Sequence, residues 1–317
     1  MFLAIAPVFL AILIGLVFGL KNRYSSEAER LINDYALYIA FPAYLFLAVA
    51  GTDPSELMNG FYIVAALAGV IVTYICGLFA ARLVGITGPN SCIVAMGASF
   101  GNTGYMGIPL ITAVLGHEAA PAASLIWVMH NIPVLVAVIL TYDLADGKRR
   151  GLLSMGGKAF TVAFSNPLTL AVLAGLGFSF FRIPLPDTLA NFARMLGAAA
   201  GPTALFAMGL GLSKIRLRTG ELTKTAKAVS AVVLLKTILF PLVTFLIMVP
   251  FVGFNFGNVW FMSAIIMASM PVGVLVYVFG ARYGFFETES SIAIIASQLL
   301  VIATLPALFY LHTLPPS

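Results

Sequence analysis

The sequence predicts an all-α polytopic membrane protein whose ten transmembrane helices form two inverted five-helix repeats. Of the 317 residues, 61% are hydrophobic and 9% are charged, whereas soluble globular domains carry roughly 25% charged residues. Long apolar segments follow one another along the chain with only short connections. Lys and Arg are concentrated in alternate connections, which indicates that the chain crosses a membrane repeatedly.

Each predicted span meets the length that a bilayer requires, which is about 20 apolar residues. The first begins at Phe2 without a preceding basic segment, so we interpret it as a span and not as a signal peptide. The predicted spans are residues 2–20, 31–50, 59–83, 92–115, 121–142, 159–181, 188–213, 226–250, 258–282 and 289–312.

Basic residues orient these spans, because cytoplasmic loops carry an excess of Lys and Arg. Most of them follow the first, third, fifth, seventh and ninth spans, while Arg182 and Arg194 fall in the opposite loops and Lys236 lies inside the eighth span. We therefore expect an integral protein of the cell (inner or plasma) membrane with both termini outside. The net charge of +5 reflects this orientation and not nucleic-acid binding.

The two halves of the sequence look related. The matched positions, all at an offset of 160 residues, are Pro7 and Pro167, Gly15 and Gly175, and the stretches 41–46 and 201–206. Because each half has an odd number of spans, the second half enters the membrane in the opposite orientation. We assign residues 1–142 to the first repeat, 143–158 to a cytosolic loop and 159–317 to the second repeat.

The fourth span should be interrupted near the middle of the membrane. Residues 92–115 contain four glycines, Pro109 and the polar pair Asn102-Thr103. A Gly within a helix costs about 1 kcal/mol relative to Ala and a Pro about 3 kcal/mol, and lipid offers no partners for freed backbone groups. Its counterpart, 258–282, contains Pro271 and Gly273 and should also be broken. Paired interrupted helices are typical of transporter binding sites.

The motif Asn102-Thr-Gly-Tyr-Met-Gly-Ile-Pro-Leu110 resembles the signature of the auxin efflux carrier family, which includes the plant PIN-formed carriers and many bacterial permeases. Residues 269–273 and 278–283 resemble the ninth span of that family. The resemblance covers the whole chain. It implies a scaffold part of spans 1, 2, 6 and 7, a transport part of spans 3–5 and 8–10, and a homodimer through the scaffold. It also implies that spans 4 and 9 cross beside the binding site of a small organic anion.

The crossing supplies most of the candidate substrate-binding residues. The Asn102 amide could bind a substrate carboxylate or complete the loose backbone, and the two roles can coexist. Half-helices that restart near Gly107 and Gly273 would direct positive dipole ends at the break, which favours an anion such as malate, malonate or an auxin-like acid. Ser297 and Gln298 would either line the site or join helices. The candidates are Ser99, Asn102, Thr103, Gly104, Tyr105, Pro109, Asn131, Pro271, Gly273 and Gln298.

Three ionisable residues are candidates for ion coupling or a charge switch. Lys236 either snorkels to the inner surface or faces the interior, where it could attract the anion or pair with Asp34. Asp34 is otherwise a solvated helix-end residue. His130 either forms a hydrogen bond with a neighbouring helix or takes part in proton coupling. We expect H⁺ or Na⁺ as the coupling ion, with no cofactor and no metal site.

The sequence argues against an intramembrane enzyme. The His residues are scattered at 117, 130 and 312, and there is no HExxH motif and no Ser-His arrangement. An anion channel or a uniporter that uses the same crossing is the alternative to a secondary transporter, although rings of charge and repeated filter sequences are not visible.

Overall fold

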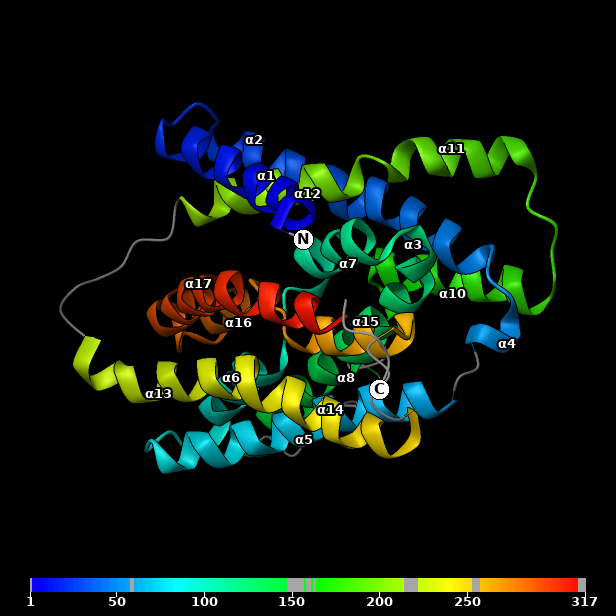
Figure 1. Cartoon of the computed structure of the whole chain (residues 1–317). Helices are drawn as coiled ribbons and strands as arrows, with labels where there is room; N and C mark the ends of the chain where they lie inside the picture. The colour runs from blue at the N-terminus through cyan, green and yellow to red at the C-terminus, as the bar shows by residue number, and fades with distance from the viewer. Residues whose placement is uncertain are drawn as a thin grey trace. The chain divides into compact units, whose positions relative to one another are not determined.

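The computed structural model describes residues 2–57, 60–146, 157, 161, 164–213, 222–252 and 257–312. These residues are helical almost throughout and contain no strand, apart from one isolated antiparallel bridge (Figure 1). The predicted all-helical class is therefore confirmed for the described part of the chain. Most of the predicted loop 143–158 lies outside the described residues.

In the first half of the chain, the helices follow the predicted apolar segments closely. Short 3₁₀ turns at Gly88–Asn90 and His117–Ala119 precede α6 and α8. The helices are α1 (Phe2–Leu20), α2 (Ser26–Tyr35), α3 (Phe41–Ala50), α4 (Pro54–Leu57), α5 (Gly60–Leu83), α6 (Ser91–Ser99), α7 (Ile108–Leu115) and α8 (Ala120–Ala145).

The second half shows the same agreement. Each of its predicted segments contains one helix or two consecutive helices. They are α10 (Pro167–Phe180), α11 (Asp187–Gly197), α12 (Ala200–Leu212), α13 (Leu222–Leu234), α14 (Phe240–Val252), α15 (Val259–Ala268), α16 (Leu275–Tyr283) and α17 (Glu287–His312).

Several helices begin at a side chain that binds a backbone N–H group of the first turn. Ser25 accepts from the Ala28 N–H at the start of α2, at 3.1 Å. Asn258 accepts from the Phe261 N–H at the start of α15, at 3.0 Å. Such a cap satisfies a donor that has no partner inside the helix. These polar residues therefore fix where the apolar helices start.

Wide π-helical turns occur before three prolines. In two of them the residue before the proline donates its N–H to the carbonyl five residues earlier: Phe41 to Ala36, and Phe240 to Leu235. A proline has no N–H group and its ring crowds the carbonyl four residues before it, and a wider turn relieves that conflict. The turns are Ala36–Ala40 before Pro42, Thr103–Gly107 before Pro109 and Leu235–Leu239 before Pro241.

Helix length and composition fit a membrane protein. Within the described residues, six helices are long and apolar enough to cross a bilayer, and four shorter apolar helices accompany them. The six are Glu27–Ala50, Pro54–Leu83, His117–Ala145, Asp187–Leu212, Ala226–Pro250 and Thr288–Pro306. The four shorter ones are Ala6–Leu20, Thr103–Leu115, Pro167–Phe180 and Val259–Ala268.

The chain divides into two compact units. Unit 1 comprises Met1–Gly60, Thr103–Val128 and Phe164–Ile215, and unit 2 comprises Phe61–Asn102, Met129–Ala163 and Arg216–Ser317. The boundary between them cuts the fourth predicted span at Asn102 and Thr103.

Unit 1 is held together by close helix pairs. Helix α1 lies along α12, as Figure 1 shows, and a Cβ atom added at Gly15 or Gly209 would overlap the backbone of the other helix. Helices α3 and α10 form a second pair, in which a Cβ atom added at Gly175 would lie 2.9 Å from the Phe46 carbonyl oxygen. Small residues thus bring the backbones together, as is common between membrane helices.

In unit 2, α6 is buried among neighbouring helices. A Cβ atom added at Gly77 of α5 would lie 2.6 Å from the Cα atom of Ala95. One added at Gly97 would lie 2.9 Å from a methyl group of Val232 on α13. Every residue from Cys92 to Ser99 is buried. The first half of the interrupted segment is therefore fixed rigidly in this unit.

Candidate functional site

The fourth predicted span is interrupted after Ser99. Helix α6 ends there, and Phe100 adopts an extended backbone with φ −91° and ψ 109°. The Ser99 hydroxyl donates to the Ala95 carbonyl at 2.9 Å, so it satisfies a group of its own helix. Helical structure resumes at Thr103. The break falls within the Gly-rich stretch that the sequence indicated.

The ninth predicted span is interrupted in the same way. Helix α15 ends at Ala268 and α16 begins at Leu275. The Ser269 hydroxyl donates to the Ile265 carbonyl at 2.7 Å and closes the end of α15. Pro271 lies between the two helices, where its missing N–H group costs no helical hydrogen bond.

The two interruptions bind each other through their main chains. Gly101 and Val272 form an antiparallel bridge. The Asn102 N–H donates to the Pro271 carbonyl at 2.8 Å, and the Gly273 N–H donates to the Phe100 carbonyl at 3.0 Å. We call Phe100–Asn102 together with Pro271–Gly273 the crossing. Backbone groups freed by each break are thus satisfied by the other, as a water-poor environment requires.

A third element completes the crossing. The Val272 N–H donates to the Ser297 hydroxyl at 3.0 Å, and that hydroxyl donates to the Ile294 carbonyl at 3.0 Å. Both contacts come from α17, and the Ser297 side chain is fully buried. Of the two roles that the sequence left open for Ser297, the structure has it joining helices.

The crossing is tightly packed around glycine. A Cβ atom added at Gly273 would lie 2.6 Å from a ring carbon of Phe100 and 3.0 Å from the Gly101 carbonyl oxygen. Any larger residue at position 273 would have to displace the ring or the backbone. This requirement explains why the second break pairs a proline with a glycine.

Lys236 is buried in unit 2 at the end of α15. Its side chain has no exposed surface, and its Nζ atom donates to the Ala268 carbonyl at 2.5 Å. The Nζ atom also lies 4.6 Å from the centre of the Phe240 ring. A cation at a helix C-terminus is stabilised by the partial negative charge of the last carbonyls. The side chain therefore faces the protein interior in the structure, which is the second of its two predicted placements.

His130 and Lys236 both lie against the ring of Phe240. Its imidazole is 4.9 Å from the Phe240 ring, centre to centre, and 2% exposed. Neither of its nitrogens forms a hydrogen bond with a described group. The expected hydrogen bond to a neighbouring helix is therefore absent from the described residues, and a role in proton coupling stays a prediction.

Buried amides are the other polar groups of unit 2 that the sequence singled out. Asn102 is 5% exposed, and Asn131 and Gln298 are 6% exposed. All three have polar or ring interactions within the chain. Among the described residues, no group of three or more His, Cys, Asp or Glu side chains could hold a metal ion.

The remaining candidates belong to unit 1. Thr103 is buried, and a Cβ atom added at Gly104 would lie 3.0 Å from the Trp127 indole nitrogen. The Tyr105 ring meets the Phe41 ring edge-on at 6.0 Å. Pro109 lines a cavity, and Asp34 lies near Tyr105.

The second half of the fourth span was expected to restart near Gly107, and α7 begins at Ile108 with Gly107 as its N-cap residue. Helical structure of another kind resumes earlier, at Thr103. The reason is the π-helical turn Thr103–Gly107, which accommodates Pro109 without ending the helix. Gly107 is consequently inside a helical run.

Comparison with known proteins identifies the family. The sequence model of a family described as "Membrane transport protein" matches residues 1–310. The chain belongs to this family. This is the family that the Asn102–Leu110 motif indicated, so the chain is related to the auxin efflux carriers and the bacterial permeases of that family.

Two relatives match the chain over nearly its full length. A protein of Rhizobium meliloti (strain 1021) named "Putative malonate transporter" is 29% identical over 312 residues, which cover 97% of this chain and 94% of the relative. An uncharacterized transporter of Methanocaldococcus jannaschii is 22% identical over 311 residues, which cover 94% of this chain and 92% of the relative.

Proposed function

We propose that the protein is a secondary transporter that moves a small organic anion, a carboxylate, across the membrane by alternating access. The observation that carries this proposal is the crossing, in which two helix interruptions that lie in unit 2 are joined by main-chain hydrogen bonds among buried residues. Interrupted helices place polar backbone at membrane depth, which membrane proteins tolerate where it lines a site or is enclosed by protein.

The electrostatics of unit 2 favour an anionic substrate. Lys236 places a buried cation at the end of α15, beside the second break. Helix α16 begins at Leu275, directly after the crossing, so its N-terminal N–H groups and positive dipole end point back toward it. The Asn102 amide adds donors at the first break. Together these groups can compensate a carboxylate without a buried Arg.

Malonate is the first substrate to test. The name of the Rhizobium relative supports a short dicarboxylate, and malate and auxin-like acids belong to the same chemical class of small organic anions. A carboxylate of this size would be recognised by a few directed donors and not by a large apolar surface. We propose H⁺ or Na⁺ as the coupling ion, which uptake driven by a pH gradient or by a sodium gradient would distinguish.

We further propose ten spans in two inverted repeats, and unit 1 supports this arrangement. Gly15 lies against the Phe206 carbonyl oxygen, and Gly175 lies against the Phe46 carbonyl oxygen. Gly15 corresponds to Gly175, and Phe46 corresponds to Phe206, each at an offset of 160 residues. A pseudo-two-fold axis between the halves would produce this pattern, because it turns a contact of the first half with the second into the reciprocal contact of the second half with the first.

The ends of α1 and α10 support the same relation. Asn22 and Arg182 both adopt φ 49°, an uncommon conformation for residues other than glycine. The Asn22 N–H donates to the Gly19 carbonyl and the Arg182 N–H to the Ser179 carbonyl, each at 3.0 Å. Asn22 and Arg182 are again 160 residues apart.

In the proposed mechanism, spans 3–5 and 8–10 move as a transport part against a scaffold of spans 1, 2, 6 and 7, in a membrane where both termini lie outside. The scaffold would also carry a homodimer contact. The same crossing would then be exposed to each side in turn. An anion channel or uniporter that uses the crossing is the alternative.

Transport by purified protein in proteoliposomes tests the proposal. We expect saturable uptake of radiolabelled malonate and counterflow when the vesicles are preloaded with unlabelled malonate. Ohmic anion current without counterflow would instead identify a channel. Uptake of none of malonate, malate and a monocarboxylate would contradict the proposed substrate class.

A substitution at the crossing tests the site itself. Asn102→Asp keeps the shape of the side chain but adds a buried negative charge that repels a carboxylate, so we expect uptake to fall by about tenfold or more. Asn191→Asp, which makes the same change on the exposed surface of α11, is the matched control. Equal uptake by the N102D variant and the wild type would exclude Asn102 from substrate binding.

A further inference from the structure

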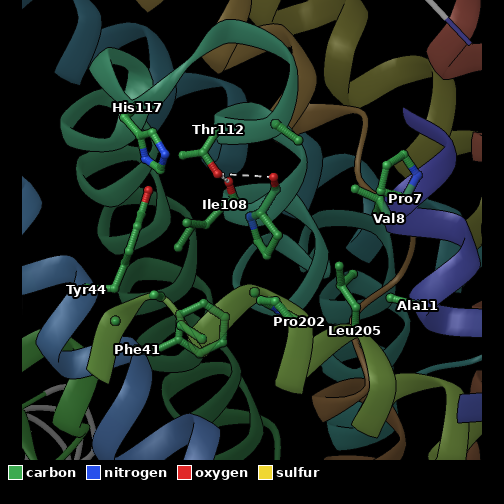
Figure 2. A pocket seen from close by; sticks show the side chains of 16 residues that line it. Pro7, Val8, Ala11, Phe41, Tyr44, Ile108, Thr112, His117, Pro202 and Leu205 are labelled. Carbon is green, nitrogen blue, oxygen red and sulfur yellow. Dashed lines mark hydrogen bonds between the residues drawn. The ribbon is translucent and has the colours of Figure 1, made fainter. Parts of the chain in front are cut away.

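Unit 1 contains a cavity of about 380 Å³. Its lining comes from α1, α3, α7 and α12, together with the end of α11 and the turn that starts at His117. Figure 2 shows the side chains that surround it. The apolar part of the wall consists mainly of Pro7, Val8, Ala11, Phe41, Ile108 and Leu205.

The polar side chains of the cavity gather on one side. Tyr44, Thr112 and His117 lie there, and in Figure 2 the Tyr44 hydroxyl points toward the other two. That hydroxyl is buried near Thr112, yet it makes no hydrogen bond with any described group. The Thr112 hydroxyl donates its proton to the carbonyls of Ile108 and Pro109, both at 3.1 Å, so its lone pairs remain as acceptors. The His117 side chain is exposed at this side.

This arrangement specifies the chemistry of an occupant. The lining includes no Lys, Arg, Asp or Glu side chain, so a doubly charged molecule would lose its hydration without compensation. The buried Tyr44 hydroxyl can donate its proton, and the Thr112 hydroxyl beside it can accept one. A carboxyl group in its protonated form carries an acceptor and a donor on two separate oxygen atoms, so it can pair with both hydroxyls, whereas an alcohol has only one oxygen for both roles. The apolar wall suits a hydrocarbon chain.

We propose that this cavity binds a single-chain amphiphile of the fatty-acid type, with its hydrocarbon tail along the apolar wall and its carboxyl group beside Tyr44, Thr112 and His117. The site is separate from the crossing and does not depend on the proposed transport activity. An occupant would contact α7, which follows the Asn102–Gly107 part of the motif, as well as α1, α3 and α12. It would therefore hold α7, which belongs to the proposed transport part, against the scaffold helices α1, α3 and α12, and would oppose their relative movement.

Photolabelling of the purified full-length chain tests the site. The probe is a ten-carbon fatty acid that carries a diazirine in its tail, and labelled peptides are mapped by mass spectrometry. We expect labelling of residues in α1, α3, α7 or α12, which decanoate prevents, decanol prevents less well and malonate leaves unchanged. Equal competition by decanol, or labelling spread evenly over exposed helices, would overturn the proposal.

Variants separate the head-group contact from the cavity. Tyr44→Phe removes one hydrogen-bond donor, so we expect decanoate to compete about tenfold more weakly, with little change for decanol. Thr169→Val is the matched control, because it removes another buried hydroxyl of unit 1 that has no partner among the described groups. Decanoate competition that is unchanged in Y44F would contradict the proposed head-group contact.

Filling the cavity provides an independent readout. Leu205→Trp and Ala11→Phe each place an aromatic ring in the cavity, from α12 and α1 respectively. If one variant does not fold, the other still tests the proposal. We expect both to abolish the labelling that decanoate prevents. If that labelling persists in a folded variant, the amphiphile binds elsewhere and the proposal fails.

Discussion

At the scale of single residues, Lys236 is the feature that most sharply links structure to transport. Its ammonium group is bound by a main-chain carbonyl at 2.5 Å, and no described acidic side chain forms an ion pair with it. A buried cation without a counter-ion is costly. Functional use is the usual reason that membrane proteins retain such a group.

We therefore expect Lys236→Met to lower malonate uptake by about tenfold or more, since the positive charge beside the crossing is lost. Thermal stability should stay the same or rise, because Met fills similar space without a buried charge. Lys227→Met, on an exposed position of α13, is the control. Uptake assays and melting curves on both variants give the comparison. Uptake within twofold of wild type for K236M would rule out a role for the charge.

Ser297 and Ser263 provide a second comparison at the residue scale. Both side chains are fully buried in unit 2, but only Ser297 has a hydrogen-bond partner among the described groups. Ser297→Ala leaves the Val272 N–H unsatisfied, so we expect a loss of about 1–3 kcal/mol in stability. Ser263→Ala removes an unpaired hydroxyl and should be neutral or stabilising. Melting temperatures in detergent measure both, and equal values would mean that the α17 contact contributes nothing.

At the scale of elements, glycines decide how closely the helices of unit 1 approach. Gly175 and Gly177 both lie in α10, yet a Cβ atom at Gly175 would lie 2.9 Å from the Phe46 carbonyl oxygen, and one at Gly177 would meet nothing within 4 Å. Gly175 therefore faces the backbone of α3, whereas Gly177 of the same helix faces open space.

We expect Gly175→Ala to destabilise the protein by about 1–3 kcal/mol, because α3 and α10 must move apart. Gly177→Ala should stabilise it by up to about 1 kcal/mol, because Ala restricts the unfolded chain. Gly15→Ala should resemble Gly175→Ala, since Gly15 contacts the Phe206 backbone. Thermal unfolding of the three variants tests this order. A melting temperature for G175A at or above that of G177A would contradict the close packing.

The sequence predicts most elements and both breaks because their causes are local. Apolar length marks the helices, and the Gly and Pro residues of 97–109 and 271–273 mark the interruptions. The partners of those interruptions are harder to predict. Lys236 binds the Ala268 carbonyl, and main-chain acceptors carry no signature in a sequence. The π-helical turn at Thr103–Gly107 was missed because Pro109 was interpreted as part of the break.

At the scale of the whole molecule, the proposed inverted repeat makes a prediction about topology. Asn22 and Arg182 occupy equivalent positions, 160 residues apart, at the ends of α1 and α10. If the halves are inverted, the two residues lie on opposite sides of the membrane. Arg182 would be outside and Asn22 inside.

Labelling with a membrane-impermeant maleimide tests this topology. In a background without Cys76 and Cys92, we expect Arg182→Cys to react in intact cells and Asn22→Cys to react only after permeabilisation. The parent without cysteines controls for background labelling. Reaction of both variants from the same side would show that the halves are not inverted.

The link between Gly101 and Val272 is made by peptide groups and not by side chains. A substitution at position 102 therefore leaves this link intact, provided that the new residue has a backbone N–H group. Proline is the one residue that would remove the hydrogen bond from position 102 to the Pro271 carbonyl, because it has no backbone N–H group.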